Sequence, residues 1–165
     1  MYSMQNVETG SSNVAIGYTA LAGVAGNDMD YNVAIGAQAL YSNTSGDDNT
    51  AIGRNALFSN TSAGQNTAVG SESLEANTTG TLNVAVGYSA LESNTVGKSN
   101  VAIGHSALND NVIGDENIAI GDSALSSLQA ASDGDGENTA VGHSSGVDMT
   151  TGEKNTLFGH QTGQG

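Results

Sequence analysis

The sequence predicts an all-β fold, a parallel β-solenoid, on three observations. The phrase Asn-(Val/Thr/Ile)-Ala-(Ile/Val)-Gly occurs eight times in the 165 residues and once more as Asn-Thr-Leu-Phe-Gly, in steps of 19, 17, 17, 17, 17, 17, 21 and 17 residues. A near-constant period of this size is typical of solenoids and stacked arrays. The chain has 23 Gly and no Pro, which suits tight turns between uninterrupted backbone ladders. Residues 1–165 therefore form one repeat array of about nine 17-residue coils.

Two columns of the repeat are invariant, and positions are counted here from the Asn. Position 1 is Asn13, Asn32, Asn49, Asn66, Asn83, Asn100, Asn117, Asn138 and Asn155. Position 5 is Gly17, Gly36, Gly53, Gly70, Gly87, Gly104, Gly121, Gly142 and Gly159. We interpret the Asn column as a ladder of side-chain amides that caps the turns of coils stacked about 4.8 Å apart.

The residues between these columns predict a strand. Alternation sends positions 2 and 4 to one face and position 3, an Ala in eight copies, to the other. The recurring Ala indicates close packing, which we expect on both faces. Position 9 is Leu in seven copies and forms a second apolar column beside position 4.

The second half of the repeat predicts a turn. Segments such as Asn43-Thr44-Ser45-Gly46 and Asn77-Thr78-Thr79-Gly80 carry residues that accept left-handed backbone conformations. Each coil is thus expected to run strand, turn, short strand, turn. Solenoids of helix pairs need about 33 to 47 residues per unit, so a 17-residue period argues against them.

The charge and composition argue against several classes of function. Seventeen acidic residues stand against Arg54, Lys98 and Lys154, a net charge of −14, so no basic surface exists to bind nucleic acid. Cysteine is absent. No stretch approaches the 18 apolar residues of a membrane span, and no signal-peptide pattern opens the chain. We expect neither nucleic-acid binding nor membrane insertion.

The 21-residue repeat contains the main irregularity, an acidic loop at residues 128–137. Its Asp133, Asp135 and Glu137 supply the oxygen ligands that Ca²⁺ prefers, although the Ca²⁺-loop pattern is incomplete. We favour a protruding loop without a cofactor, and we expect these three residues to form a contact surface because loops that interrupt a regular scaffold commonly carry function.

Histidine appears only at position 6, as His105, His143 and His160. Three copies of one His around a symmetry axis could bind a metal ion, but the variability of position 6 favours a solvent-facing column. No nucleophile, base and orienting acid stand out together, and no phosphate-binding motif is complete. We therefore expect no catalytic, metal or cofactor-binding residues and no enzyme activity.

The core of one coil is too small to stabilise it alone. Each coil offers about three core residues, whereas ordering one residue costs on the order of 1 to 2 kcal/mol. The missing burial is expected from further copies of the chain. We predict a homotrimer, with end-to-end contact to further fibre segments as an additional mode.

The repeats resemble two related groups. The Asn-x-Ala-(Ile/Val)-Gly phrase is similar to the head repeats of YadA-like trimeric autotransporter adhesins. The segments from Asn49 to Gly64 and from Asn66 to Gly80 resemble the arrays of phage tail-fibre and bacterial surface-fibre proteins. The resemblance covers nearly the whole chain. It implies a trimer of left-handed β-rolls, an extracellular location on a virion or a bacterial surface, and attachment to a cell-surface receptor or glycan.

Two departures keep other functions open. The coils are longer than those of YadA-like heads, and no stalk or anchor pattern is present, so we interpret the chain as a segment of a longer fibre. One alternative is a self-assembling extracellular filament. Another is an ice-binding solenoid, suggested by Thr50, Thr67, Thr139 and Thr156 at position 2, although Val or Ile interrupts that column.

Overall fold

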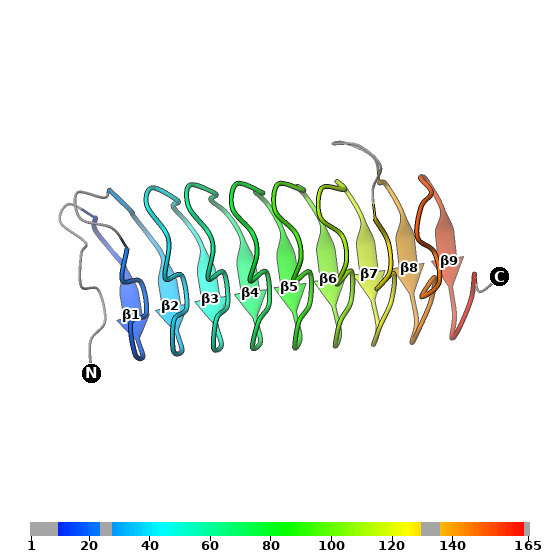
Figure 1. The fold of residues 1–165 in the computed structure, drawn as a ribbon, viewed down its shortest axis with the longest axis horizontal. Helices are drawn as coiled ribbons and strands as arrows, with labels where there is room; N and C mark the ends of the chain where they lie inside the picture. The colour runs from blue at the N-terminus through cyan, green and yellow to red at the C-terminus, as the bar shows by residue number, and fades with distance from the viewer. Residues whose placement is uncertain (1–9, 24–27, 130–135, 164–165) are drawn as a thin grey trace.

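The structure, a computed structural model, describes residues 10–23, 28–129 and 136–163. Nine three-residue strands form one parallel sheet in which each strand pairs with the next along the chain. They lie in a single row that runs from β1 at one end to β9 at the other (Figure 1). The strands are β1 (Val14–Ile16), β2 (Val33–Ile35), β3 (Thr50–Ile52), β4 (Thr67–Val69), β5 (Val84–Val86), β6 (Val101–Ile103), β7 (Ile118–Ile120), β8 (Thr139–Val141) and β9 (Thr156–Phe158).

The strands are in register by repeat position. Ala51 pairs with Ala68, and Ala140 pairs with Leu157 at the variant copy. The 19- and 21-residue repeats keep the same register, as Val14 with Val33 and Ile118 with Thr139 show. The extra residues of these repeats are therefore accommodated in the connections.

The predicted parallel β-solenoid is confirmed. Eight connections link the nine strands, and the described residues contain no helix. The predicted second short strand is wrong, because positions 7 to 9 form a turn in the described coils. Asn55 and Leu57 have φ of 58° and 52°, which is left-handed backbone that no strand contains. The backbone N–H of Leu57 still donates to the carbonyl of Ser73 in the next coil, at 3.1 Å.

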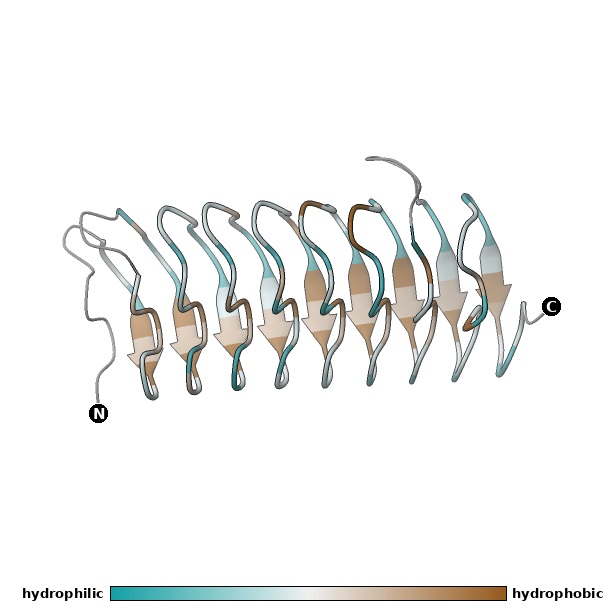
Figure 2. Ribbon diagram, viewed as in Figure 1, coloured by the Kyte–Doolittle hydropathy of each residue, from teal (hydrophilic) through white to brown (hydrophobic). Residues whose placement is uncertain are grey.

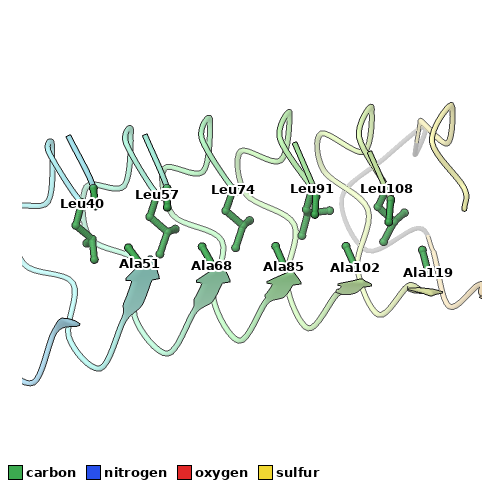
Figure 3. Packing of buried hydrophobic residues seen from close by; sticks show 14 of the residues in the cluster. Leu40, Ala51, Leu57, Ala68, Leu74, Ala85, Leu91, Ala102, Leu108 and Ala119 are labelled. Carbon is green, nitrogen blue, oxygen red and sulfur yellow. The ribbon is translucent and has the colours of Figure 1, made fainter. Parts of the chain in front are cut away.

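The core lies inside the coil, between the strand and this turn. Ala at position 3 points inward and meets Leu at position 9, as Ala68 and Leu74 illustrate (Figure 3). Both side chains are 0% exposed. The coil is so thin at this point that one Leu and one Ala nearly fill it, which is why position 3 stays small.

Close packing is observed on the inner face of the strand, whereas close packing on the outer face, which further copies of the chain would supply, stays a prediction. Positions 2 and 4 point out of the coil, and Ile52, Ile103 and Ile120 are 37–38% exposed. In the described part of the chain, the Ile and Val of position 4 therefore lie outside the core of their own coil and are partly exposed or exposed.

The position 5 glycines are required by the stacking. Gly53 has φ of 142°, and a Cβ at this residue would lie 2.2 Å from the carbonyl oxygen of Gly70 in the next coil. Both the backbone conformation and the close approach exclude a side chain. Among the residues that the structure describes, no helix is long and apolar enough to cross a membrane.

Candidate functional site

The position 1 Asn side chains form a continuous polar ladder. The Asn32 Oδ1 accepts from the backbone N of Asn49 at 3.0 Å and from its Nδ2 at 3.1 Å. The Asn49 Nδ2 also donates to the carbonyl of Ala63 across the same coil, at 2.9 Å. Each amide thus connects two coils and closes its own coil. The same column includes buried Asn32, Asn49, Asn66, Asn83, Asn100, Asn117 and Asn138.

A second Asn ladder runs parallel to the first at position 12. The Asn60 Nδ2 donates to Asn43 Oδ1 and to the carbonyl of Ala63, both at 2.9 Å. The carbonyl of Ala63 therefore accepts from Asn49 and Asn60 together. This ladder includes Asn43, Asn60, Asn77, Asn94 and Asn111. Sequence reasoning treated these residues only as turn formers, although their 17-residue spacing was the signal for a ladder.

The second ladder ends where Leu128 takes position 12. Leu128 cannot donate, and the buried Oδ1 of Asn111 has no hydrogen-bond partner. A row of Thr hydroxyls lies beside the ladder, with Thr61 Oγ1 donating to the carbonyl of Thr78 at 3.0 Å. The buried Asn ladders and the partly buried Thr row account for the recurrent Asn and Thr as stabilising elements of the coil.

The surface left for function is the outer sheet face, defined as positions 2 and 4 of β1–β9. Of its 18 side chains, 14 are Val, Ile or Phe and four are Thr. None is charged, although the chain carries 17 acidic residues. The apolar ends of most strands stand out in Figure 2. An uncharged apolar strip therefore runs along the whole described sheet.

Two columns border the outer sheet face. The leading rim, the residue before each position 1 Asn, is Ser12, Tyr31, Asp48, Gln65, Leu82, Ser99, Glu116, Glu137 and Lys154. The trailing rim, position 6, is Tyr18, Ala37, Arg54, Ser71, Tyr88, His105, Asp122, His143 and His160. Several of these side chains are widely exposed, with Tyr31 at 61%, Leu82 at 53% and Tyr88 at 50%.

The three histidines lie on the trailing rim and are exposed. His143 and His160 stack at 5.1 Å between ring centroids, and His105 stacks on Tyr88 at 5.6 Å. The Nδ1 of His105 lies 3.6 Å from Asp122 Oδ2. In the described part of the chain no group of three His, Asp or Glu side chains converges as metal ligands.

Carboxylates near the trailing rim have perturbed pKa values. Hydrogen bonds from Tyr88 and Arg54 lower the pKa of Glu72. Burial, followed by the charge of Glu72, raises the pKa of Glu75 despite a hydrogen bond from Asn55. Both carboxylates thus lie close to the residues of the trailing rim, with Arg54 and Tyr88 beside Glu72.

The acidic loop is only partly described. Asp133 and Asp135 lie outside the described residues, so their predicted contact role stays a prediction. Glu137 belongs to the leading rim, where its Oε1 lies 3.6 Å from Lys154 Nζ. Just before Glu137, the backbone pairs with the preceding coil through a parallel β-bridge between Asp115 and Gly136.

Comparisons with known protein-family models, curated proteins and solved structures find no match to this chain.

Proposed function

We propose that this chain is a structural and adhesive fibre segment that assembles with copies of itself through the outer sheet face and attaches to a host or neighbouring cell surface. The observation that carries the proposal is the uncharged apolar face along nine strands. Three-residue strands and nine coils give it a flat area of about 430 Å². Exposed apolar patches larger than a few hundred Å² mark interaction sites in soluble proteins.

The distribution of charge favours self-association through this face. A chain with net charge −14 repels its own copies. The outer sheet face is the surface where copies can meet without burying a carboxylate, because all of its 18 side chains are uncharged. Its Val and Ile side chains would gain the burial that a single coil lacks.

The dimensions of the face favour three copies around an axis. Packed sheets lie about 10 Å apart, so each wall of a cyclic assembly stands about 5 Å from the axis. By plane geometry a three-walled prism then has walls about 17 Å wide, and a four-walled prism walls about 10 Å wide. The span from leading to trailing rim is six residue steps, about 20 Å when extended. Three copies fit this width best.

The first test is the solution mass measured by light scattering without denaturant. Three chains of 16.4 kDa give about 49 kDa. Val86→Lys places a charge in the middle of the outer face and should convert the assembly to monomers, because a buried unpaired charge costs several kcal/mol. The matched control is Ser93→Lys, on another side of the same coil, which should keep the mass. A monomeric wild-type chain would contradict the assembly.

The adhesive part is tested by binding to cells. An assembly of three chains exposes three identical copies of the remaining surface to a cell. Such an assembly increases apparent affinity by about 10²- to 10⁴-fold over a single chain. Fluorescently labelled wild-type chain should therefore remain on bacterial or animal cells from which the Val86→Lys chain washes off. Equal retention of the two would contradict multivalent attachment. Combined Asp133→Asn, Asp135→Asn and Glu137→Gln substitutions, which leave the buried Leu128 in place, test the acidic loop as the contact surface, and they should reduce retention on cells.

A second candidate function, ice binding, is favoured by one observation. The Thr of position 2 lie on the outer face, and Thr50 and Thr67 are neighbours in the ladder. Thr139 and Thr156 are also neighbours. A monomer that shows thermal hysteresis would support this function instead, and mass that grows with concentration would support a filament.

A further inference from the structure

We infer that the leading rim of one copy pairs with the trailing rim of the next copy at the same strand level, so that the copies form a closed parallel ring. This inference rests on the proposed self-association through the outer sheet face. It adds which residues meet at the corners of the assembly and how the copies are oriented.

The two rims of one copy cannot reach each other. Asp48 precedes β3 and Arg54 follows it, six residue steps apart along nearly extended chain, which is about 20 Å. Within its own chain Arg54 instead pairs with Glu72 of the next coil. Contact between the rims therefore requires two copies. The outer face alone is about 10 Å wide, so an assembly of three copies, with walls about 17 Å wide, includes the rims in its walls.

The rims differ in charge in a way that favours this pairing. The leading rim carries three acids and one Lys: Asp48, Glu116, Glu137 and Lys154. The trailing rim carries one Arg, three His and one acid: Arg54, His105, His143, His160 and Asp122. Pairing two leading rims would bring acids together, whereas leading against trailing brings acids against Arg and His.

Individual levels agree with the pairing. At β3, Asp48 would meet Arg54, whose side chain is 56% exposed. At β5, the half-exposed apolar Leu82 would meet the half-exposed Tyr88.

Three levels nearer the C-terminus give one agreement and two exceptions, one of them at β9, where Lys154 would meet His160 and two basic side chains would face each other. At β8, Glu137 would meet His143. At β7, Glu116 would meet Asp122, and this like-charge level is offset by His105, whose Nδ1 lies 3.6 Å from Asp122. In a closed ring, the shifts along the solenoid axis from one copy to the next must add up to zero. The paired residues must therefore belong to the same coil in each copy.

Disulfide crosslinking tests the inference, because the chain has no cysteine of its own. A disulfide needs Cα atoms about 4.4–6.8 Å apart, so Cys at Leu82 and Tyr88 cannot bond within one chain. The Leu82→Cys/Tyr88→Cys variant, oxidised under native conditions, should give covalent trimers on a denaturing gel. A mixture of the two single variants should give covalent dimers, and each single variant alone should stay uncrosslinked.

Control variants test whether the paired residues belong to the same coil in both copies. Leu82→Cys combined with Ser71→Cys, or with His105→Cys, moves one partner by a coil and should crosslink at least tenfold less. Crosslinking of Leu82→Cys alone would overturn the inference, because it would show rim-to-identical-rim contact. Equal crosslinking one coil away would overturn the shared level. A native mass of three chains without crosslinking of the double variant overturns only the rim pairing, whereas a monomeric mass overturns the self-association itself.

Discussion

The side chain of Leu157 occupies the space that a side chain on Gly146 would need. A Cβ on Gly146 would lie 2.8 Å from Leu157 Cδ1, and equally 2.8 Å from Leu125 Cδ2. Leu157 is the one large residue at position 3 of the strands, and Gly146 stands where seven coils have Leu. Across the last two coils, one Leu at position 3 therefore stands in exchange for the Leu of position 9, which is Gly in both coils, as Gly146 and Gly163; a Cβ on Gly163 would lie 2.9 Å from Leu157 Cδ2.

This exchange predicts coupled stability effects at the two residues. Leu157→Ala should cost about 2 kcal/mol, the low end for a Leu deletion because the site is half-buried. Gly146→Leu should cost about 1–3 kcal/mol by overpacking. The double variant removes the clash between the side chains at these two positions and should cost at least about 1 kcal/mol less than the sum. Urea unfolding of the four proteins measures this, and simple additivity would refute the exchange.

The second Asn ladder predicts that the cost of losing an amide depends on its place in the row. Asn77 bonds Asn60 and Gly80, and it accepts from Asn94 at 2.9 Å. Asn77→Leu should therefore cost about 3 kcal/mol by leaving buried polar groups unpaired.

Asn111→Leu provides the matched control in the same column. The Asn111 Oδ1 already lacks a partner, so its replacement should cost about 1 kcal/mol. Thermal unfolding compares the two variants. Equal losses would mean that the ladder adds nothing beyond the turn preference of Asn.

The glycine column predicts a large difference between two chemically identical substitutions. A Cβ on Gly70 would lie 2.3 Å from the carbonyl oxygen of Gly87, whereas the nearest atom to a Cβ on Gly159 is Thr162 Cγ2 at 3.3 Å. Both residues have positive φ. Gly159→Ala should cost about 1–2 kcal/mol of backbone strain, and Gly70→Ala should exceed about 4 kcal/mol or prevent folding. Circular dichroism during thermal unfolding distinguishes them.

The repeat period predicted the parallel solenoid, because a 17-residue step is too short for a pair of helices and is typical of stacked coils. Ala68 and Leu74 were identifiable as core candidates from their regular spacing. The sequence does not show whether the position 4 side chains point into the coil or out of it. Period-2 alternation separates the two faces of a strand, but it does not show which face the rest of the coil covers. The backbone turn at positions 7 to 9 decides this, and its left-handed residues include Leu57, a residue type that gives no sequence signal for such a conformation.

The two rims could not be predicted from the sequence, for a related reason. Leu82 and Tyr88 are six residues apart and differ in type, so no motif links them. Their relation appears only when stacked coils place every residue before Asn on one edge and every position 6 residue on the other. The function itself depends on contacts between molecules, which one chain's pattern of burial can only indicate.

The last prediction concerns the pH dependence of stability through Glu75. Burial and the neighbouring Glu72 and Glu92 charges raise its pKa above the usual 4.5. A carboxyl whose pKa is raised by folding favours the folded state when protonated, and this contribution is lost as pH rises through the folded pKa. Glu75→Gln should therefore stabilise the fold at pH 7 relative to wild type, with no gain at pH 3.

The control for this prediction is Glu153→Gln, which removes the same charge from an exposed residue. Because the chain is strongly acidic, losing any carboxylate reduces general repulsion, and the control measures that effect. Urea unfolding at pH 3, 5 and 7 should show a larger gain for Glu75→Gln than for Glu153→Gln only above about pH 5. Equal gains at every pH would assign the effect to net charge and remove any special role for the partly buried Glu75 carboxyl.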